Sequence, residues 1–169
     1  MNFYSMEDRQ EIGDKGIEIV TAYLKNNKRV NKIVNVENYK EFQKKDIDIL
    51  VNMNIEGIPK WVAIEVKCDS YASGNLYVET ISNMNKNTLG CLMYSEAHYL
   101  FYYFEKYQDL YILPMKKFRN WFKDNIKRFN KKNLFTKLPD GKILYESEGY
   151  TVPLKIIKQE FRPLRIIHF

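Results

Sequence analysis

The sequence has few cysteines and histidines, and no spacing that links them. Its 169 residues include two cysteines, Cys68 and Cys91, and two histidines, His98 and His168. They form no CxxC pair and no arrangement typical of a metal site, so we interpret the cysteines as small hydrophobic residues and assign the histidines no role. Unpaired thiols favour a reducing compartment, and we expect the protein to be cytoplasmic.

The sequence also lacks long apolar runs and linkers. The aromatic stretch Tyr99–Phe104 is far shorter than the about 18 residues that a membrane-spanning helix needs. The N-terminal segment has no positively charged part followed by an apolar one, so we expect neither a secretory signal nor a membrane partner. Because no repeat or Pro/Gly/Ser-rich stretch divides the chain, we predict a single domain over residues 1–169.

What the chain does have is packing material and positive charge. Hydrophobic residues make up 45% of it, including 13 Tyr and 10 Phe, and the formal net charge is +6. This composition is sufficient for a folded core and excludes a disordered chain. The charge favours a polyanionic partner without distinguishing nucleic acid from an acidic lipid surface.

Hydrophobic periodicity predicts a helix followed by short strands. Ser5–Asp8 has the form of a capping box, and apolar residues then recur at helical spacing up to Asn26–Asn27. The expected strands are Arg29–Val36, Asp46–Met53, Trp61–Cys68, Leu76–Thr80, Tyr99–Glu105 and Asp109–Met115. The segment 82–99 is ambiguous, with one short helix and loops as its interpretation.

The last third of the chain predicts a basic helix and a hairpin. The helix is expected over Met115–Lys132, with aromatic residues on one side and Lys/Arg on another. Pro139–Gly141 is a turn signal, and Ile143–Ser147 and Tyr150–Ile157 are interpreted as the arms of the hairpin. The class is therefore α/β or α+β with a mixed sheet, in which residues 1–113 form the core and 114–169 an extension.

Ionisable residues occur inside segments that otherwise have the pattern of buried strands. Since side chains alternate along a strand, Glu65 and Lys67 share a face, and antiparallel pairing through the intervening turn would bring Asp48 opposite Glu65. Two carboxylates about 4 Å apart repel by about 4 kcal/mol at an effective dielectric near 20, unless a cation lies between them. Oxygen ligands without His or Cys favour Mg²⁺ or Mn²⁺. A lysine beside such an ion suits phosphodiester hydrolysis.

At these residues the sequence resembles the PD-(D/E)XK nuclease superfamily, whose signature is an acid at the start of one core strand and E-x-K in the next. Asp48 and Glu65–Lys67 match it. The resemblance implies that Asp48 and Glu65 hold a metal ion and that Lys67 assists the attacking water. It also implies a restriction-endonuclease-like core of a helix, three antiparallel strands, a helix and a further strand, and it covers about Ser5–Phe104.

The wider string EVKCDSYASGNLYVE resembles phage and bacterial members in which E-x-K-x-D precedes Gly-Asn and another glutamate. This likeness adds Asp69, Asn75 and Glu79 as site residues. The members that the sequence resembles include restriction-endonuclease-like and junction-resolvase-like ones. Many relatives carry a metal-site glutamate on the first helix, where Glu18 is the candidate, although it falls nearly opposite the apolar stripe. Glu79 is the alternative third carboxylate. Many relatives act as dimers, so the resemblance implies a homodimer.

We expect a metal-dependent endonuclease that acts on DNA, and two other functions stay open. The residues expected to contact the phosphate backbone are Lys116, Arg119, Lys123 and Lys127. The first alternative is a nucleic-acid-binding or interaction protein that has this fold and does not cleave. The second is a membrane-surface or protein-inhibitor role of the basic helix. Taken alone, the acids on Asp46–Met53 and the Glu65/Lys67 pair are each also typical of a solvated strand face.

Overall fold

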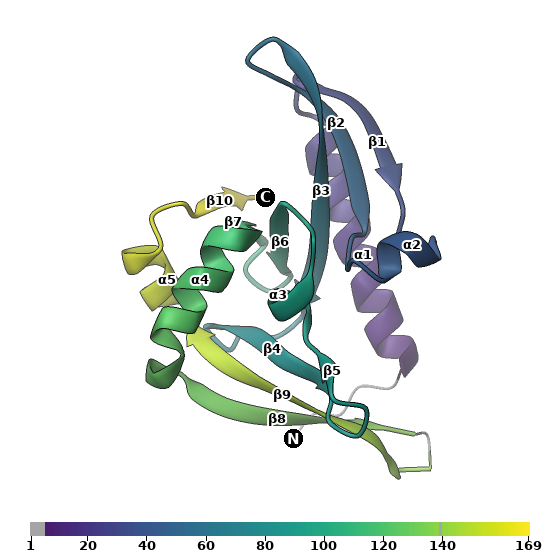
Figure 1. Cartoon of the computed structure of the whole chain (residues 1–169), viewed down its shortest axis with the longest axis vertical. Coiled ribbons are helices and arrows are strands. Elements are labelled where there is room, and N and C mark those ends of the chain that lie inside the picture. Colours follow the sequence, from purple (N-terminus) through teal and green to yellow (C-terminus); the bar gives the residue numbers. More distant parts are fainter. Residues whose placement is uncertain (1–5, 139) are drawn as a thin grey trace.

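The computed structural model describes residues 6–138 and 140–169, which form an α+β fold with two packed sheets (Figure 1). The first sheet is mixed and has the order β1-β2-β3-β6-β7-β10 in this part of the chain. Its strands are β1 Val30–Asn35, β2 Ile49–Ile55, β3 Ile58–Asp69, β6 Tyr99–Phe104, β7 Asp109–Pro114 and β10 Arg165–His168. β6 runs parallel to β3, and the other neighbours are antiparallel. The predicted mixed sheet is confirmed.

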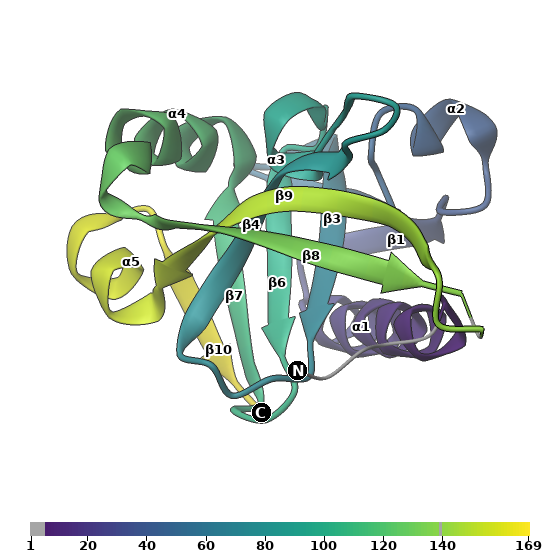
Figure 2. The ribbon, with the colours of Figure 1, turned by 90° about the horizontal axis from the view of Figure 1, so that it is seen from below.

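The second sheet is antiparallel, with the order β5-β4-β9-β8. Its strands are β4 Asn75–Asn83, β5 Thr88–Leu89, β8 Asn130–Lys137 and β9 Ile143–Pro153. Figure 2 shows β8 and β9 crossing the first sheet on the side away from α1. Because β8, β9 and β10 all come from the last third of the chain, the segment 114–169 contributes strands to both sheets.

The helices differ greatly in length. They are α1 Met6–Lys25, α2 Lys40–Gln43, α3 Cys91–Tyr94, α4 Met115–Asn125 with a 3-10 turn at Ile126–Arg128, and α5 Leu154–Glu160. The expected N-terminal helix is confirmed, whereas its capping box at Ser5 lies outside the described residues. The ambiguous segment 82–99 contains one short helix, α3, as expected. It also contains the short strand β5, which was not expected.

The hydrophobic core lies on both faces of the first sheet. On one face, Val20 and Leu24 of α1 pack with Ile64 and Val66 of β3. Gly16 makes this approach close, since a Cβ atom there would lie 2.9 Å from the Cβ atom of Cys68. The other face packs against the second sheet, α4 and α5. Because side chains alternate along β3, its odd-numbered residues point away from α1 and toward the second sheet.

The β2–β3 hairpin sets the register of the predicted site. Glu56 and Gly57 both have left-handed backbone angles, with φ of 54° and 82°, which is typical of a two-residue hairpin turn. Ile49 pairs with Ile64 across the hairpin, and the backbone N–H of Asp48 donates to the carbonyl of Ile64 at 3.0 Å. The expected antiparallel pairing, with Asp48 at the Glu65 end, is confirmed.

The strand expected over Asp46–Met53 begins later than predicted. β2 starts at Ile49, because Asp46 has a left-handed φ of 55° and ends a turn that follows α2. Strand alternation consequently fails before Ile49. Ile47 packs in the core cluster on the second-sheet side, whereas Ile49 packs in the cluster beneath α1.

The basic helix expected over Met115–Lys132 is also shorter. α4 ends at Asn125, the 3-10 turn ends at Arg128, and Phe129 has an extended backbone. From Asn130 onward the backbone pairs with β9, which supplies the hydrogen bonds that a longer helix would otherwise need. Prediction of a helix up to Lys132 was wrong, because helical spacing alone does not reveal a partner strand.

The C-terminal hairpin exists with different arms. Of the predicted turn, Pro139 lies outside the described residues, and Asp140 and Gly141, with a φ of 84° at Gly141, lie between β8 and β9. The expected arms Ile143–Ser147 and Tyr150–Ile157 instead form one strand, β9, followed by α5. Assignment of the last residues of the second arm to a strand was wrong, since α5 begins directly after Pro153.

Candidate metal centre

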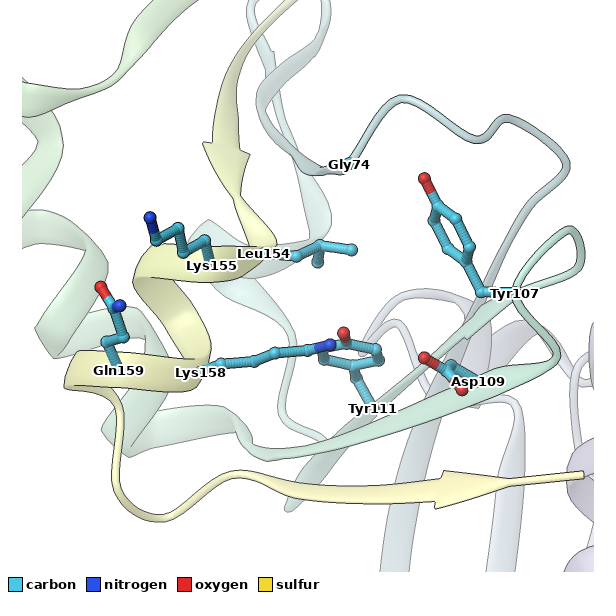
Figure 3. A pocket seen from close by; sticks show the side chains of 8 residues that line it. All are labelled: Gly74, Tyr107, Asp109, Tyr111, Leu154, Lys155, Lys158 and Gln159. Carbon is cyan, nitrogen blue, oxygen red and sulfur yellow. The ribbon is translucent and has the colours of Figure 1, made fainter.

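A pocket of about 530 Å³ lies between α5 and the start of β7 (Figure 3). Lys158 extends over the Tyr111 ring, with its Nζ atom 5.6 Å from the ring centroid. The Asp109 carboxylate is bound to His168, with Oδ1 2.5 Å from Nδ1. The residues lining this pocket include no residue of the predicted site, so the acids before β2 and on β3 lie outside it.

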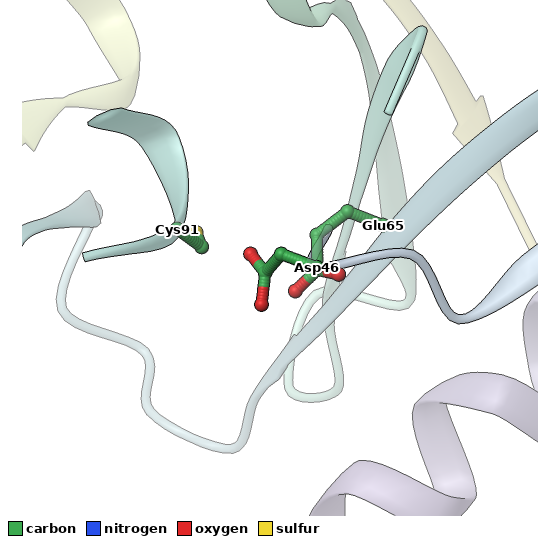
Figure 4. Close-up of side chains that lie close together, drawn as sticks. All are labelled: Asp46, Glu65 and Cys91. Carbon is green, nitrogen blue, oxygen red and sulfur yellow. The ribbon is translucent and has the colours of Figure 1, made fainter. Parts of the chain in front are cut away.

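Three potential metal ligands from distant parts of the sequence meet at the first sheet, on the side away from α1. One ligand atom each from Asp46, Glu65 and Cys91 lies within 4.8 Å of the other two. Figure 4 shows the three side chains converging from the turn before β2, from β3 and from the start of α3. We call this group the acid–thiol cluster. These three residues could together hold a metal ion.

Glu65 is the most buried member of the cluster, with a relative accessibility of 1%. Its Oε1 atom contacts the Nζ atom of Lys67, whose side chain is 42% exposed. The Oε2 atom is buried and has no hydrogen-bond partner among the described residues. Since a buried charge without a partner is unfavourable, Glu65 is compensated at one oxygen only.

Asp46 has a similar unsatisfied oxygen. The Tyr94 hydroxyl donates to its Oδ1 atom at 3.3 Å, and the Ser95 hydroxyl donates to its backbone carbonyl at 3.0 Å. Its Oδ2 atom is buried without a hydrogen-bond partner in the described part of the chain. Two neighbouring acids thus each present one bare oxygen, which is the arrangement that a cation would satisfy.

The electrostatics of the cluster follow from burial. Burial raises the pKa of Glu65 well above its usual value, and the charges of Asp48 and Asp46 raise it further against the attraction of Lys67. Burial likewise raises the pKa of Asp46. For Lys67, burial lowers the pKa, but the attraction of Glu65 and smaller contributions from other neighbours outweigh it, so the pKa ends well above its usual value. The lysine therefore stays charged.

Asp48 lies beside the acid–thiol cluster. Its Oδ2 atom accepts a hydrogen bond of 2.8 Å from the backbone N–H of Val66, which follows Glu65 on β3. Its charge contributes to the raised pKa of both Asp46 and Glu65. The predicted proximity of Asp48 and Glu65 is thus present, although the three-ligand group contains Asp46 and not Asp48.

Cys91 enters the cluster because α3 is held tightly from two sides. The backbone N–H of Gly90 donates to the carbonyl of Thr80, and a Cβ atom at Gly90 would lie 2.1 Å from the carbonyl oxygen of Glu79. From α4, the Arg119 guanidinium donates to the carbonyls of Leu92 and Ser95, each at 2.5 Å. The start of α3 is therefore fixed in front of Glu65.

The other predicted ligands lie outside the cluster. Glu18 is exposed on α1, about 200° around the helix from Gly16, which faces β3, so it points away from the sheet. Glu79 is closer, since its charge contributes to raising the pKa of Cys91. Asp69 accepts hydrogen bonds from the Tyr71 backbone and the Tyr102 hydroxyl. Asn75 bonds to Ser73 within its own loop.

The predicted phosphate-binding residues are not equivalent. Lys116 and Lys123 are exposed on α4, and Lys127 is exposed on the 3-10 turn that follows it. Arg119 is half-buried and bonded to the two α3 carbonyls. In the described residues, no helix is both long and apolar enough to cross a membrane.

No family model, no curated protein and no solved structure matches the chain. The cluster is therefore interpreted from its geometry.

Sequence reasoning missed two members of the cluster. Asp46 had a signal, since it is a second acid two residues before the predicted ligand Asp48. Cys91 had none, because it lies in the ambiguous segment and no spacing links it to the acids. Cys91 was interpreted only as a small hydrophobic residue, and its Sγ atom lies within 4.8 Å of a ligand atom of Asp46 and of Glu65.

Proposed function

We propose that this protein is a metal-dependent nuclease that hydrolyses phosphodiester bonds in DNA. The observation that carries the proposal is the pair of buried, unsatisfied oxygens on Asp46 and Glu65, next to the charged Lys67. A divalent cation would satisfy these two oxygens, which no donor among the described residues reaches. A non-catalytic acidic cluster in a sheet would instead be expected to have all its oxygens bonded or solvated.

The ligand set fits Mg²⁺ or Mn²⁺ through its carboxylates. Asp46 and Glu65 would hold the ion, and Asp48, whose charge acts on both of them, lies beside them. When bound, such an ion lowers the pKa of a water molecule and stabilises negative charge on a phosphate. The chain itself orients the ligands, because the Val66 N–H holds Asp48 and the Tyr94 hydroxyl holds Asp46.

Besides the carboxylates that would hold the metal ion, Lys67 is the other catalytic group in this proposal. It stands two residues after Glu65 on the same face of β3, and its contact with Oε1 keeps it beside the carboxylates. Its raised pKa keeps the ammonium protonated. A protonated lysine here can orient the attacking water or stabilise the charge that develops on the phosphate. It does not act as a base in that state.

The restriction-endonuclease-like fold is also a proposal. It is supported by the order of α1, the antiparallel strands β1, β2 and β3, and β6 parallel to β3. Between β3 and β6, where the resemblance implies a helix, this chain has β4, β5 and the four-residue α3. A homodimer stays a prediction, and the exposed lysines of α4 are the proposed contacts with the DNA backbone.

The test is a cleavage assay with supercoiled and linear DNA in Mg²⁺, in Mn²⁺ and in chelator. We expect cleavage only with metal, and we expect Asp48→Ala, Glu65→Gln and Lys67→Ala to abolish it while retaining the circular dichroism of the parent. Glu160→Gln is the matched control, since this acid is exposed and paired with Arg128. A folded parent protein that binds DNA equally well in chelator and never cleaves it would replace the nuclease by the binding-module alternative.

A further inference from the structure

Building on the proposed nuclease site, we propose that Asp46, Glu65 and Cys91 form a three-ligand site for a thiophilic divalent cation, such as Zn²⁺ or Cd²⁺, in competition with Mg²⁺ or Mn²⁺. The site differs from an all-oxygen magnesium site because one of the three converging side chains is a thiol. Carboxylates serve hard and soft cations alike, whereas a thiolate ligand favours zinc and cadmium over magnesium.

The spacing of the three ligand atoms suits a single zinc ion. Zinc lies about 2.3 Å from sulfur and about 2.1 Å from carboxylate oxygen, so tetrahedral ligands of these two kinds are about 3.6 Å apart. Each pair of ligand atoms in the cluster lies within 4.8 Å. Closure around an ion thus shortens each sulfur–oxygen distance by at most about 1.2 Å, within the reach of rotamer adjustment.

The bare carboxylate oxygens give independent support for a ligand here. Glu65 is 1% exposed, and its Oε2 atom has no hydrogen-bond partner in the described structure. Its other oxygen is held by Lys67, so Oε2 is the atom left to meet an ion. Figure 4 shows the Asp46 carboxylate between Glu65 and Cys91, and one ligand atom of each residue lies within 4.8 Å of the other two.

Three protein ligands leave one tetrahedral position for water, which is the pattern of an open zinc site. Binding is balanced by loss of a proton: the Cys91 thiol releases its proton to solvent as the sulfur–metal bond forms. The two carboxylates and the thiolate then carry three negative charges against two on the ion. The Lys67 ammonium beside Glu65 balances the remainder.

The second cysteine supplies a matched control. Cys68 is the residue after Lys67, so its side chain lies on the opposite face of β3, where Gly16 of α1 packs against it. The group of three metal-ligating side chains does not include it. A thiol-dependent signal from the cluster must therefore disappear with Cys91 and survive loss of Cys68.

The experiment titrates the full chain with Co²⁺, a spectroscopic substitute for Zn²⁺, and records the near-ultraviolet sulfur-to-metal charge-transfer absorption. We expect one equivalent of Co²⁺ to produce the band in the parent and in Cys68→Ser, and Zn²⁺ to displace it. Cys91→Ser should lose the band and bind Zn²⁺ about tenfold more weakly or worse, because even residues that only orient a ligand contribute about 10–100-fold. Asp46→Asn should weaken Zn²⁺ binding while the thiol is still present.

Two outcomes would overturn the thiol site: a parent without the band, or a band that persists in Cys91→Ser and vanishes in Cys68→Ser. Circular dichroism of each variant separates loss of a ligand from loss of the fold. Mg²⁺-dependent DNA cleavage by the parent tests the proposed function separately. A parent that cleaves DNA without giving the band refutes only the thiol site, and one that gives the band without cleaving refutes only the nuclease.

Discussion

Lys67 contacts Glu65 from two residues further along the same strand, and it reaches only one of the two carboxylate oxygens. The glutamate side chain is 2% exposed, whereas the lysine side chain is 42% exposed. The pair therefore joins a fully buried carboxylate to a lysine side chain that remains partly in water. Such incomplete compensation is typical of sites where function opposes stability.

Replacement of Glu65 by glutamine should separate activity from stability. The neutral amide removes the buried charge and can donate a hydrogen bond to the Asp46 carboxylate. We expect the free energy of unfolding of the metal-free protein to be maintained or to rise by on the order of 1 kcal/mol. Metal-dependent cleavage should fall at least about 100-fold, because a direct ligand is lost. Urea denaturation and a cleavage assay of the same sample measure both, and a large loss of stability would contradict our account of Glu65.

The raised pKa values predict a pH dependence. Since the pKa of Glu65 is higher in the folded than in the unfolded chain, its contribution to stability is complete below its usual value of 4.5. That contribution is lost as pH rises through the folded pKa. The stability advantage of Glu65→Gln over the parent should therefore grow as the pH rises above 4.5 in chelator. Mg²⁺ should reduce this stability advantage. A stability difference between variant and parent that does not change with pH would rule out the buried charge as its cause.

Local sequence patterns predicted the elements that position the site. The recurrence of apolar residues at helical spacing predicted that α1 has a buried face, on which Val20 and Leu24 lie. The alternation of Ile64 and Val66 with Glu65 and Lys67 predicted opposite faces of β3. These predictions succeeded because helix and strand periodicity depend on nearest neighbours in the chain.

The remaining features depend on contacts between distant residues. Asp46 joins the cluster through a left-handed turn that strand alternation does not anticipate. Cys91 reaches Glu65 only because Gly90 and Arg119 fix α3 against β4 and α4. Asn130–Lys137 forms a strand because its backbone pairs with that of β9. Pairing between segments so far apart has no local signature in one sequence.

Replacement of Arg119 should affect the stability of the fold more than it affects DNA binding. Its guanidinium donates to the carbonyls of Leu92 and Ser95, and lysine cannot form both bonds in the same geometry. We expect Arg119→Lys to lower the free energy of unfolding by about 2 kcal/mol. The control is Arg128→Lys, whose exposed pair with Glu160 should contribute at most about 1 kcal/mol. If both variants lose the same small free energy of unfolding and only Arg119→Lys binds DNA more weakly, then Arg119 contacts phosphate as first predicted.

The exposed lysines of the basic helix should determine the salt dependence of DNA binding. Neutralising Lys116, Lys123 and Lys127 together with glutamine should reduce the slope of log affinity against log salt by up to about 3, since each phosphate contact contributes about 0.9. Fluorescence anisotropy across a salt series measures the slope. The control neutralises three exposed lysines on and near β1 to β3 with the same change in net charge: Lys28, Lys32 and Lys60. Equal effects of both triple variants would show a general charge effect.

Gly90→Ala should disturb the position of Cys91 by a backbone clash. The backbone angles of Gly90 suit any residue, but the new Cβ atom would lie 2.1 Å from the Glu79 carbonyl oxygen, so the two chain segments must separate. We expect the free energy of unfolding to fall by about 1–3 kcal/mol and Zn²⁺ binding to weaken.

Gly13→Ala is the matched control for Gly90→Ala. Nothing lies within 4 Å of a Cβ atom at Gly13 in the middle of α1, so the same substitution should stabilise the protein by about 0.5–1 kcal/mol through helix propensity. Urea denaturation of the two variants should therefore give changes of opposite sign. Changes of the same sign would mean that the segment before α3 is not held against β4 as closely as the cluster requires, and Cys91 would then not be fixed in front of Glu65.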